Sequence, residues 1–470
     1  MVGPSDLILP VFVLLIASGG AIEAADFKPI DAETVAAYEK LGGVYGQIVF
    51  DDPLAPDRFT FTVGTKAKKN AIPAFRFEKD PTDKFPEVAV PFGLLLFGPN
   101  TTDARLKELA PLQTLTTLHL AYTKVTDHGM KELAQLKNLA WVSVDGTAVT
   151  HTGVKELASL KKLTTFHMDR KNVTDECIRV LFATDLFRAA ALAKGKARSR
   201  PGSSDAVEEV DLNYTAVTDA GLKELAVLKN LTRASLGKTA VTDAGLKELT
   251  AHTKLAILQV WGTKITDAGM KSVAELKMLR ILGLGNTRVA HVGLRELASL
   301  RNLEMLQLSP DQLTEESVRV MIEHDLLHRT DKARAPRGAK SARETTMVDL
   351  IGAKVTGGLL KELAPLKDLT SLKLGDANVT DAMLKELPRF EKLTTLDLGV
   401  TKVTDAGLKE LTGLTNLTTL NLWGAAVTDK GLRELAQFKK LTRLTLEKTQ
   451  VTPAGVLELQ KALPMCVIVR

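Results

Sequence analysis

Apolar residues return along most of this chain in a pattern that repeats every 24 residues. The copy that starts at Leu393 reads LTTLDLGVTKVTDAGLKELTGLTN. Leucines that alternate with polar residues at its start predict a short strand, and leucines at three-residue spacing in its second half predict the apolar stripe of a short helix. Each unit therefore predicts one strand and one helix. The strand leucines are Leu393, Leu396 and Leu398, and the helix leucines are Leu408, Leu411 and Leu414.

The residues between strand and helix have the properties that a helix start requires. Val403 continues the core around the turn, and Thr404 is a good N-cap because its hydroxyl can accept a bond from a free backbone N–H. Asp405 follows in the first turn, where a negative charge suits the helix dipole. Gly407 lowers helix propensity, and we interpret it as room for close packing between neighbouring units.

Fourteen copies of this unit cover residues 91–464. One copy cannot bury its own apolar positions, but stacked copies can. We therefore predict a right-handed α/β solenoid, a horseshoe with a parallel sheet on its concave face and helices on its convex face. Clear copies begin at Leu115, Leu139, Leu231, Leu255, Leu279, Leu369, Leu393, Leu417 and Leu441, and weaker copies begin at Pro91, Leu163, Val207, Leu303 and Thr345.

The unit LxxLxLxxTxVTDAGLKELAxLxx resembles the leucine-rich-repeat superfamily. It is most similar to the class with ITDxGL turns, found in secreted repeat proteins of bacteria and in the repeats of F-box ubiquitin-ligase subunits. That class has Cys or Asn where this chain has Thr, whose hydroxyl can still bond to the backbone of the turn. The resemblance implies a protein partner docked against the concave sheet and does not name that partner. These threonines are Thr123, Thr147, Thr263 and Thr401.

The start of the chain predicts an exported protein. An apolar run, LILPVFVLLIA, follows Asp6, and small residues after it make Ala24 or Ala25 a plausible cleavage point, although Lys and Arg are missing before the run. We expect residues 1–25 to be a signal peptide, with an uncleaved signal anchor as the alternative. The protein would then be secreted, periplasmic or in the cell envelope, and held at a membrane only if the signal stays uncleaved.

Residues 26–90 differ in composition from the repeats. Nine of the fifteen Phe and eight of the eighteen Pro lie between Phe27 and Pro99, and the segments GQIVF, RFTFTV and PAFRFE predict short strands. Because a solenoid end exposes a layer of leucines, we interpret this region as an N-terminal cap, with an independent binding domain as the alternative. Residues 465–470, MCVIVR, predict a strand that caps the other end.

Two copies carry basic insertions, at residues 187–206 and 327–344. The chain has a net charge of +6, and residues 1–25 hold Asp6 and Glu23, so the rest carries +8. Each insertion carries +4, which accounts for this charge and leaves the repeats neutral. Their cations are Arg188, Lys194, Lys196, Arg198, Arg200, Arg329, Lys332, Arg334, Arg337, Lys340 and Arg343, and their acids are Asp205, Asp331 and Glu344.

Two interpretations of the insertions stay open. They are either basic hooks for an anionic surface, such as an envelope polymer or an acidic protein, or solvated loops. Nucleic-acid binding is not expected, because the excess charge is not spread over the repeats and only Phe187 could interleave with it.

The sequence contains no motif for catalysis or for a cofactor, such as GxSxG, a P-loop, a Rossmann glycine pattern, CxxC or HExxH. His324 and His328 would share a helix face, as zinc ligands can, but no third ligand is evident, and we interpret this segment as a helix end that leads into a loop. His119 and His167 fall two repeats apart, and we interpret them as ordinary surface histidines. We expect no enzyme activity, no metal site and no cofactor.

Aromatic residues on the strand face are the best candidates for a binding site. The repeat register places all three Trp on the concave face or its rim, where exposed aromatic residues are typical anchors of protein interfaces. The alternative is that these rings shield neighbouring strands. The candidate residues are Trp141, Trp261, Trp423, Tyr122, Tyr214, His119, His167, Arg233 and Gln259.

These features predict a non-enzymatic scaffold that acts outside the cytoplasm and recognises a protein on its concave face. A structural protein associated with carbohydrate or envelope polymer through its basic loops is the alternative. A substrate-recognition role like that of ubiquitin-ligase repeats is disfavoured, because nothing resembles an F-box and the chain starts with an export signal.

Overall fold

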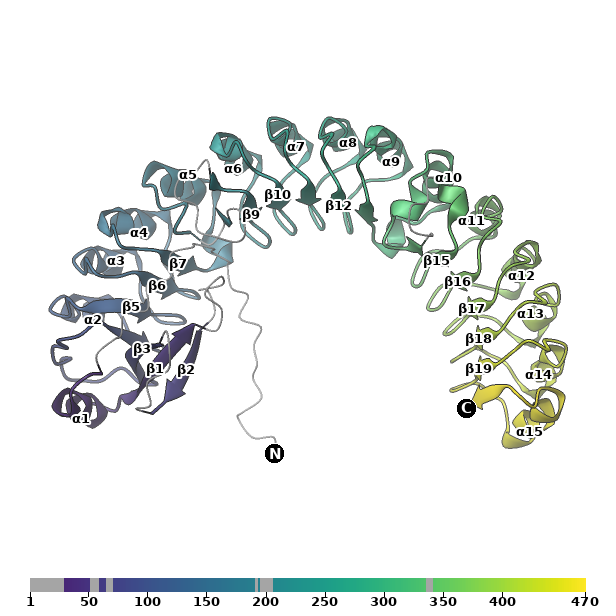
Figure 1. Ribbon diagram of the computed structural model, residues 1–470, viewed down its shortest axis with the longest axis horizontal. Helices are drawn as coiled ribbons and strands as arrows, with labels where there is room; N and C mark the ends of the chain where they lie inside the picture. The colour runs from purple at the N-terminus through teal and green to yellow at the C-terminus, as the bar shows by residue number, and fades with distance from the viewer. Residues whose placement is uncertain (1–28, 51–58, 65–70, 191–192, 195–205, 335–340) are drawn as a thin grey trace. The chain divides into compact units, whose positions relative to one another are not determined.

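The chain folds as stacked coils, each with a strand on one side and a helix on the other. The computed structural model describes residues 29–50, 59–64, 71–190, 193–194, 206–334 and 341–470. They form two compact units, Met1–Leu255 (unit 1) and Ala256–Arg470 (unit 2). In each unit the strands lie along the inner side of the curve and the helices along its outer side (Figure 1). The predicted α/β repeat solenoid is confirmed. The predicted signal, residues 1–25, lies outside the described residues.

Unit 1 contains a sheet with the strand order β2-β1-β3-β4-β5-β6-β7. β1 runs antiparallel to β2 and β3, and every later pair in this sheet is parallel. Beyond it, β9 pairs with β8 and β10. The strands are β1 (Val44–Phe50), β2 (Phe59–Val63), β3 (Ala71–Phe77), β4 (Phe92–Leu96), β5 (Leu115–His119), β6 (Trp141–Val144), β7 (Thr165–Met168), β8 (Ala193–Lys194), β9 (Glu209–Asp211) and β10 (Arg233–Ser235), and the helices are α1 (Ala32–Lys40), α2 (Asp103–Glu108), α3 (Asp127–Leu133), α4 (His151–Glu156), α5 (Asp175–Ala183), α6 (Asp219–Glu224) and α7 (Asp243–Leu249).

Unit 2 repeats the same plan. β11, β12 and β13 are parallel neighbours, and β15 to β20 form a parallel series to which β14 adds an antiparallel edge. The strands are β11 (Ile257–Gln259), β12 (Ile281–Gly283), β13 (Met305–Gln307), β14 (Ala333–Arg334), β15 (Met347–Asp349), β16 (Ser371–Lys373), β17 (Thr395–Asp397), β18 (Thr419–Asn421), β19 (Arg443–Thr445) and β20 (Val467–Val469), and the helices are α8 (Met270–Val273), α9 (His291–Glu296), α10 (Glu315–Glu323), α11 (Gly357–Glu362), α12 (Asp381–Leu384), α13 (Asp405–Lys409), α14 (Asp429–Leu435) and α15 (Pro453–Ala462).

The turn between strand and helix is built by one set of contacts in coil after coil. The Thr123 hydroxyl donates to the carbonyl of Leu120 at 2.7 Å, so the predicted bond from this threonine to the turn backbone is confirmed. The residue before it, Tyr122, has a φ of 60°, and later turns place Gly146 or Val400 in the same left-handed conformation. Side chains at this position are therefore fixed at the rim of the strand face.

Where a helix starts with aspartate, this residue joins neighbouring coils. Asp381 accepts hydrogen bonds from the backbone N–H and the hydroxyl of Thr404, at 2.8 and 2.6 Å. A Cβ added to Gly407 would lie 2.2 Å from the same carboxylate. Gly407 therefore allows close packing between coils, as predicted. The sequence predicted only that Asp405 interacts with the helix dipole. In the structure Asp405 also accepts two hydrogen bonds from Thr428 of the next coil, at 2.8 and 2.6 Å.

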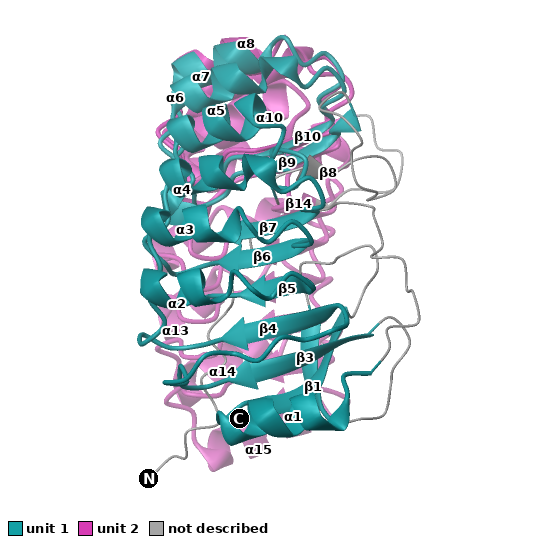
Figure 2. Cartoon of the chain, turned by 90° about the vertical axis from the view of Figure 1, so that its left-hand side faces the viewer, with its two compact units in different colours: residues 1–255 teal, residues 256–470 magenta. Residues whose placement is uncertain are grey.

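The N-terminal residues extend the repeat sheet and share its core. In unit 1 of Figure 2, α1 lies at the end of the stack beside β1 and β3. Tyr38 of α1 is fully buried and stacks on Phe75 of β3, with ring centroids 3.9 Å apart. Its hydroxyl donates to the carbonyl of Pro86 at 2.8 Å. The three strands predicted in this region are β1, β2 and β3.

Candidate binding surfaces

A cluster of five rings covers part of the strand face in unit 1. The ring of Trp141 stacks on His119 at a centroid distance of 5.9 Å and contacts His167 at 5.1 Å. Phe59 meets both His119 and Trp141 edge-on, at 5.7 and 5.2 Å, and Phe97 lies 4.8 Å from His119. We call Phe59, Phe97, His119, Trp141 and His167 the His–Trp cluster.

The cluster contradicts two expectations about exposure. Trp141 is only 3% exposed and His167 only 2% exposed, so neither is the surface side chain that the register predicted. Burial lowers the pKa of His119 to about 4. Burial, with a smaller effect of His119, lowers the pKa of His167 to about 3. At neutral pH both imidazoles are uncharged, and the Nε2 atom of His167 has no hydrogen-bond partner.

The physical reason for this burial is the β1–β2 hairpin. β2 is the edge strand of its sheet, next to β1, yet its Phe59 reaches the rings of β5 and β6. Phe50, Phe59, Phe61 and Phe97 also pack against the buried core around Ile48. The N-terminal region thus covers the strand face of unit 1 as well as the end of the stack.

In unit 2 large side chains stand at the rim of the strand face. Val400 is 44% exposed, and its backbone N–H donates to the carbonyl of Trp423 at 2.6 Å. Trp423 is half-buried, and the Lys448 ammonium lies 4.5 Å from the centre of its ring. We call Val400, Trp423 and Lys448 the rim patch. Trp423 was predicted here, whereas Val400 and Lys448 were missed, although both occupy the position before the turn residue that defines the rim.

The other candidate aromatics lie on the same rim but in different settings. Trp261 is half-buried at the corresponding place in unit 2. Tyr122 is 58% exposed and Tyr214 is 47% exposed, both in unit 1. The rim position predicted for these residues matches their left-handed backbone, at φ values of 60° and 61° for the two tyrosines.

Arg233 and Gln259 lie on the strand face and have partners there. The Arg233 guanidinium is 3.7 Å from the Glu209 carboxylate on the neighbouring strand. Gln259 donates to Gln307 at 3.0 Å, across the intervening Gly283, where a Cβ would lie 1.9 Å from the Gln259 oxygen. Both residues therefore help to fix the face on which they lie.

The basic insertions begin as part of the fold. Arg188 pairs with Asp185 at 2.9 Å, and Arg329 donates to the Leu300 carbonyl at 2.9 Å, so neither is a free hook. Lys332 lies 3.8 Å from Asp331, and Arg343 is exposed. Lys194 and Arg334 lie in β8 and β14, which pair with the first repeat strand that follows each insertion. The remaining candidates, Lys196, Arg198, Arg200, Arg337 and Lys340, lie outside the described residues.

The described residues contain no group of three or more His, Cys, Asp or Glu placed to hold a metal ion. α10 ends at Glu323, so His324 and His328 follow a helix end, as the preferred interpretation predicted, and do not share a helix face. Cys177 and Cys466 are both buried and free. Across the part of the chain that the structure describes, every helix is too short or too polar to cross a membrane.

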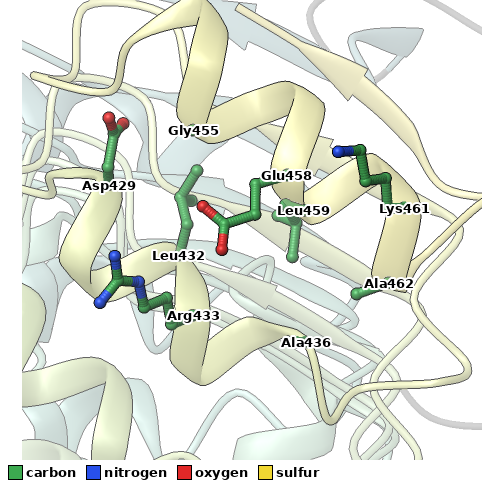
Figure 3. A pocket seen from close by; sticks show the side chains of 9 residues that line it. All are labelled: Asp429, Leu432, Arg433, Ala436, Gly455, Glu458, Leu459, Lys461 and Ala462. Atoms are coloured by element: carbon green, nitrogen blue, oxygen red, sulfur yellow. The ribbon is translucent and has the colours of Figure 1, made fainter.

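A groove of about 500 Å³ lies between α14 and α15 on the helix side of unit 2 (Figure 3). Arg433 lines it from α14, and Glu458 and Lys461 line it from α15. Its remaining carboxylate, Asp429, accepts two hydrogen bonds from Thr452, which lower the pKa of Asp429. The groove therefore has a balanced set of charges, and one of its acids is already bound within the fold.

Comparison of the sequence with known protein families finds one match. Residues 112–134 and 413–436 match the family described as Leucine Rich repeat. An internalin (inlF) from Listeria monocytogenes has 18% identity, a TM-score of 0.35 and coverage of 81% of this chain and 85% of its own. A leucine-rich-repeat protein of Leptospira interrogans (LIC12759) has 19% identity, a TM-score of 0.41 and coverage of 77% and 92%.

A plant peptide hormone receptor, RGFR1, solved in complex with RGF2, is similar at 11% identity and a TM-score of 0.32, over 86% of this chain and 66% of the receptor. No curated protein sequence matches this chain.

The stacked strand–helix coils define a solenoid repeat protein. The repeat matched in residues 112–134 and 413–436 recurs in both units with the same threonine, aspartate and glycine contacts. The chain contains leucine-rich repeats at residues 112–134 and 413–436, as its sequence pattern predicted.

Proposed function

We propose that this protein is a non-enzymatic scaffold that recognises a protein partner outside the cytoplasm, through the strand-face rim of unit 2. The rim patch is the observation that carries the proposal. A backbone hydrogen bond between Val400 and Trp423 fixes the turn that carries these two side chains. Little backbone entropy is therefore lost when a partner covers them. A half-buried Trp beside a cation is a typical anchor of protein interfaces.

The histidines and Trp141 of unit 1 do not enter this proposal. The rings of His119 and Trp141 already have a partner in Phe59 of the β1–β2 hairpin, and the ring of His167 contacts Trp141. Location outside the cytoplasm is supported by the apolar segment that precedes Ala24 in the sequence.

The proposal is tested by capture from a cell-envelope extract with the full chain as bait. Trp423→Ala is expected to abolish capture of a specific protein, whereas Met278→Ala is not. Met278 is a matched control because it is 54% exposed in the same unit but lies in the turn that enters a strand. Capture that survives Trp423→Ala and Trp261→Ala together would contradict the proposal.

A further inference from the structure

Lysines gather on one edge of unit 1, in the turns that connect each helix to the next strand. The two residues before the first leucine of each repeat form this turn, and in unit 1 five of these residues are lysines, all exposed. The described turns of this kind in unit 1 contain no acidic residue. We call this set the lysine edge, and it consists of Lys137, Lys161, Lys162, Lys229 and Lys254.

Aspartates at the helix starts of unit 1 are already bound within the fold. In unit 1, Asp127 accepts from the N–H and hydroxyl of Thr150 at 2.7 and 2.6 Å, and Asp219 accepts from Thr242 at 2.8 and 2.6 Å. Each of these carboxylates is at a helix start, whereas the lysines follow helix ends. These aspartates therefore do not neutralise the lysines that follow the helix ends.

The lysine edge is held by neutral groups. Lys137, Lys161 and Lys229 donate to carbonyls at the ends of their own helices, at 2.5, 3.1 and 2.8 Å, as the helix dipole favours. Lys162 and Lys254 instead reach the side-chain oxygens of asparagines in the preceding turn, at 2.6 and 2.5 Å. No described carboxylate lies within ion-pair distance of these five lysines.

The corresponding turns of unit 2 contain both arrangements, since Lys440 reaches the side-chain oxygen of Asn416 at 2.6 Å as in unit 1. There Lys392 pairs with Asp368 at 2.6 Å, in the same geometry that Lys162 uses with Asn138. An acid at this position is thus compatible with the fold, and unit 1 has an amide in its place. The helix dipole accounts for lysines at the helix ends, but it does not account for the missing acids.

We propose that the lysine edge binds a linear carboxylated polysaccharide. The lysine turns are adjacent in two pairs, before residues 139 and 163 and before residues 231 and 255. Within each pair the cations recur at the spacing of neighbouring coils, about 4.8 Å where the strands pair, which suits a chain with one charge on each sugar. Amide and hydroxyl groups of Asn138 and Ser159 stand between the ammonium groups and can bond to sugar hydroxyls. The described turns contain no Phe, Tyr or Trp on which bases could stack, which disfavours a single-stranded nucleic acid.

Titration of the full chain with polygalacturonate of defined length tests this proposal. In the variant Lys161→Gln/Lys162→Gln/Lys229→Gln we expect affinity to fall about tenfold or more, with a shallower dependence on salt. The matched control is Lys131→Gln/Lys155→Gln/Lys223→Gln, which removes the same charge from exposed helix lysines of the same unit. That variant should keep its affinity within about twofold.

Three results would overturn the proposal. Equal losses in the two triple variants would show attraction to net charge only. Affinity unchanged by the edge variant but lost on deletion of residues 195–205 would assign the polymer to the insertion. Binding of polyphosphate or single-stranded DNA more tightly than polygalacturonate, at equal charge concentration, would exclude the sugar polymer as the occupant. Circular dichroism confirms that each variant is folded before it is scored.

Discussion

At the scale of single residues, several of the turns that follow a strand hold a side chain in the left-handed backbone conformation. Val400 has a φ of 55°, a conformation that other turns give to Gly146, Gly424 or Asn286. For a β-branched residue this conformation is costly. Strain that is retained at an exposed position is typical of a functional site, and Val400 belongs to the rim patch.

Replacement of Val400 by asparagine should therefore stabilise the protein. We expect Val400→Asn to raise the free energy of unfolding by about 1 kcal/mol, because asparagine tolerates the left-handed region. Gly424→Ala, at the same position of the next coil, should lower it by a similar amount. Urea unfolding measures both, and a destabilised Val400→Asn variant would refute the strain argument.

The buried histidines predict a loss of stability in acid. Their pKa values in the folded chain, about 4 for His119 and about 3 for His167, lie below the unfolded value of 6.5. Below pH 6.5 the unfolded chain takes up protons that the folded chain does not, so stability present at pH 7 is lost as the pH falls towards 4. Burial raises the pKa of Asp145 to about 6, which acts in the opposite direction between pH 6 and 4.

The double variant His119→Gln/His167→Gln isolates the histidine contribution. The wild-type chain should lose more unfolding free energy between pH 7 and pH 5 than this variant does, because glutamine does not titrate. Denaturant unfolding at the two pH values gives the comparison. Identical losses in the two proteins would show that the His–Trp cluster does not bury neutral imidazoles.

At the scale of one coil, the aspartate–threonine–glycine contact fixes how neighbouring coils pack. Gly407→Ala should cost about 1–3 kcal/mol of unfolding free energy, since its new methyl group would overlap the Asp381 carboxylate that holds Thr404. Gly357→Ala is the matched control, because nothing lies within 4 Å of a Cβ there. It should be neutral or slightly stabilising. Equal effects of the two substitutions would contradict the packing role.

The sequence predicted those features of the coil that depend on contacts between residues close together in the chain. The leucine spacing predicted strand and helix, and the threonine turn bond followed from a hydroxyl near free backbone groups. Element lengths were overstated, because α13 ends at Lys409 while Leu411 and Leu414 are buried in the turns that follow. Burial requires an apolar side chain but not a helical backbone, so periodicity alone does not set the end of a helix.

At the scale of the whole molecule, prediction failed where distant parts of the sequence meet. The repeat register placed Trp141 on the strand face, which is where it lies. The register gave no information on the β1–β2 hairpin. Phe59 of this hairpin covers the ring of Trp141, although it precedes Trp141 by more than three repeat lengths in the chain. The exposed part of the predicted site therefore consists of Tyr122 and Tyr214 in unit 1 and of the rim in unit 2.

Site-specific photo-cross-linking tests most directly the claim that this leucine-rich-repeat chain recognises a protein through the rim of unit 2. A photoreactive phenylalanine derivative replaces Trp423 in one variant and Lys409, an exposed residue of α13, in the other. We predict that illumination in envelope extract joins one protein to the variant at position 423 and not to the variant at position 409, and that unlabelled wild-type chain competes. Cross-links of equal yield at both positions, or from position 409 alone, would contradict recognition through the strand-face rim.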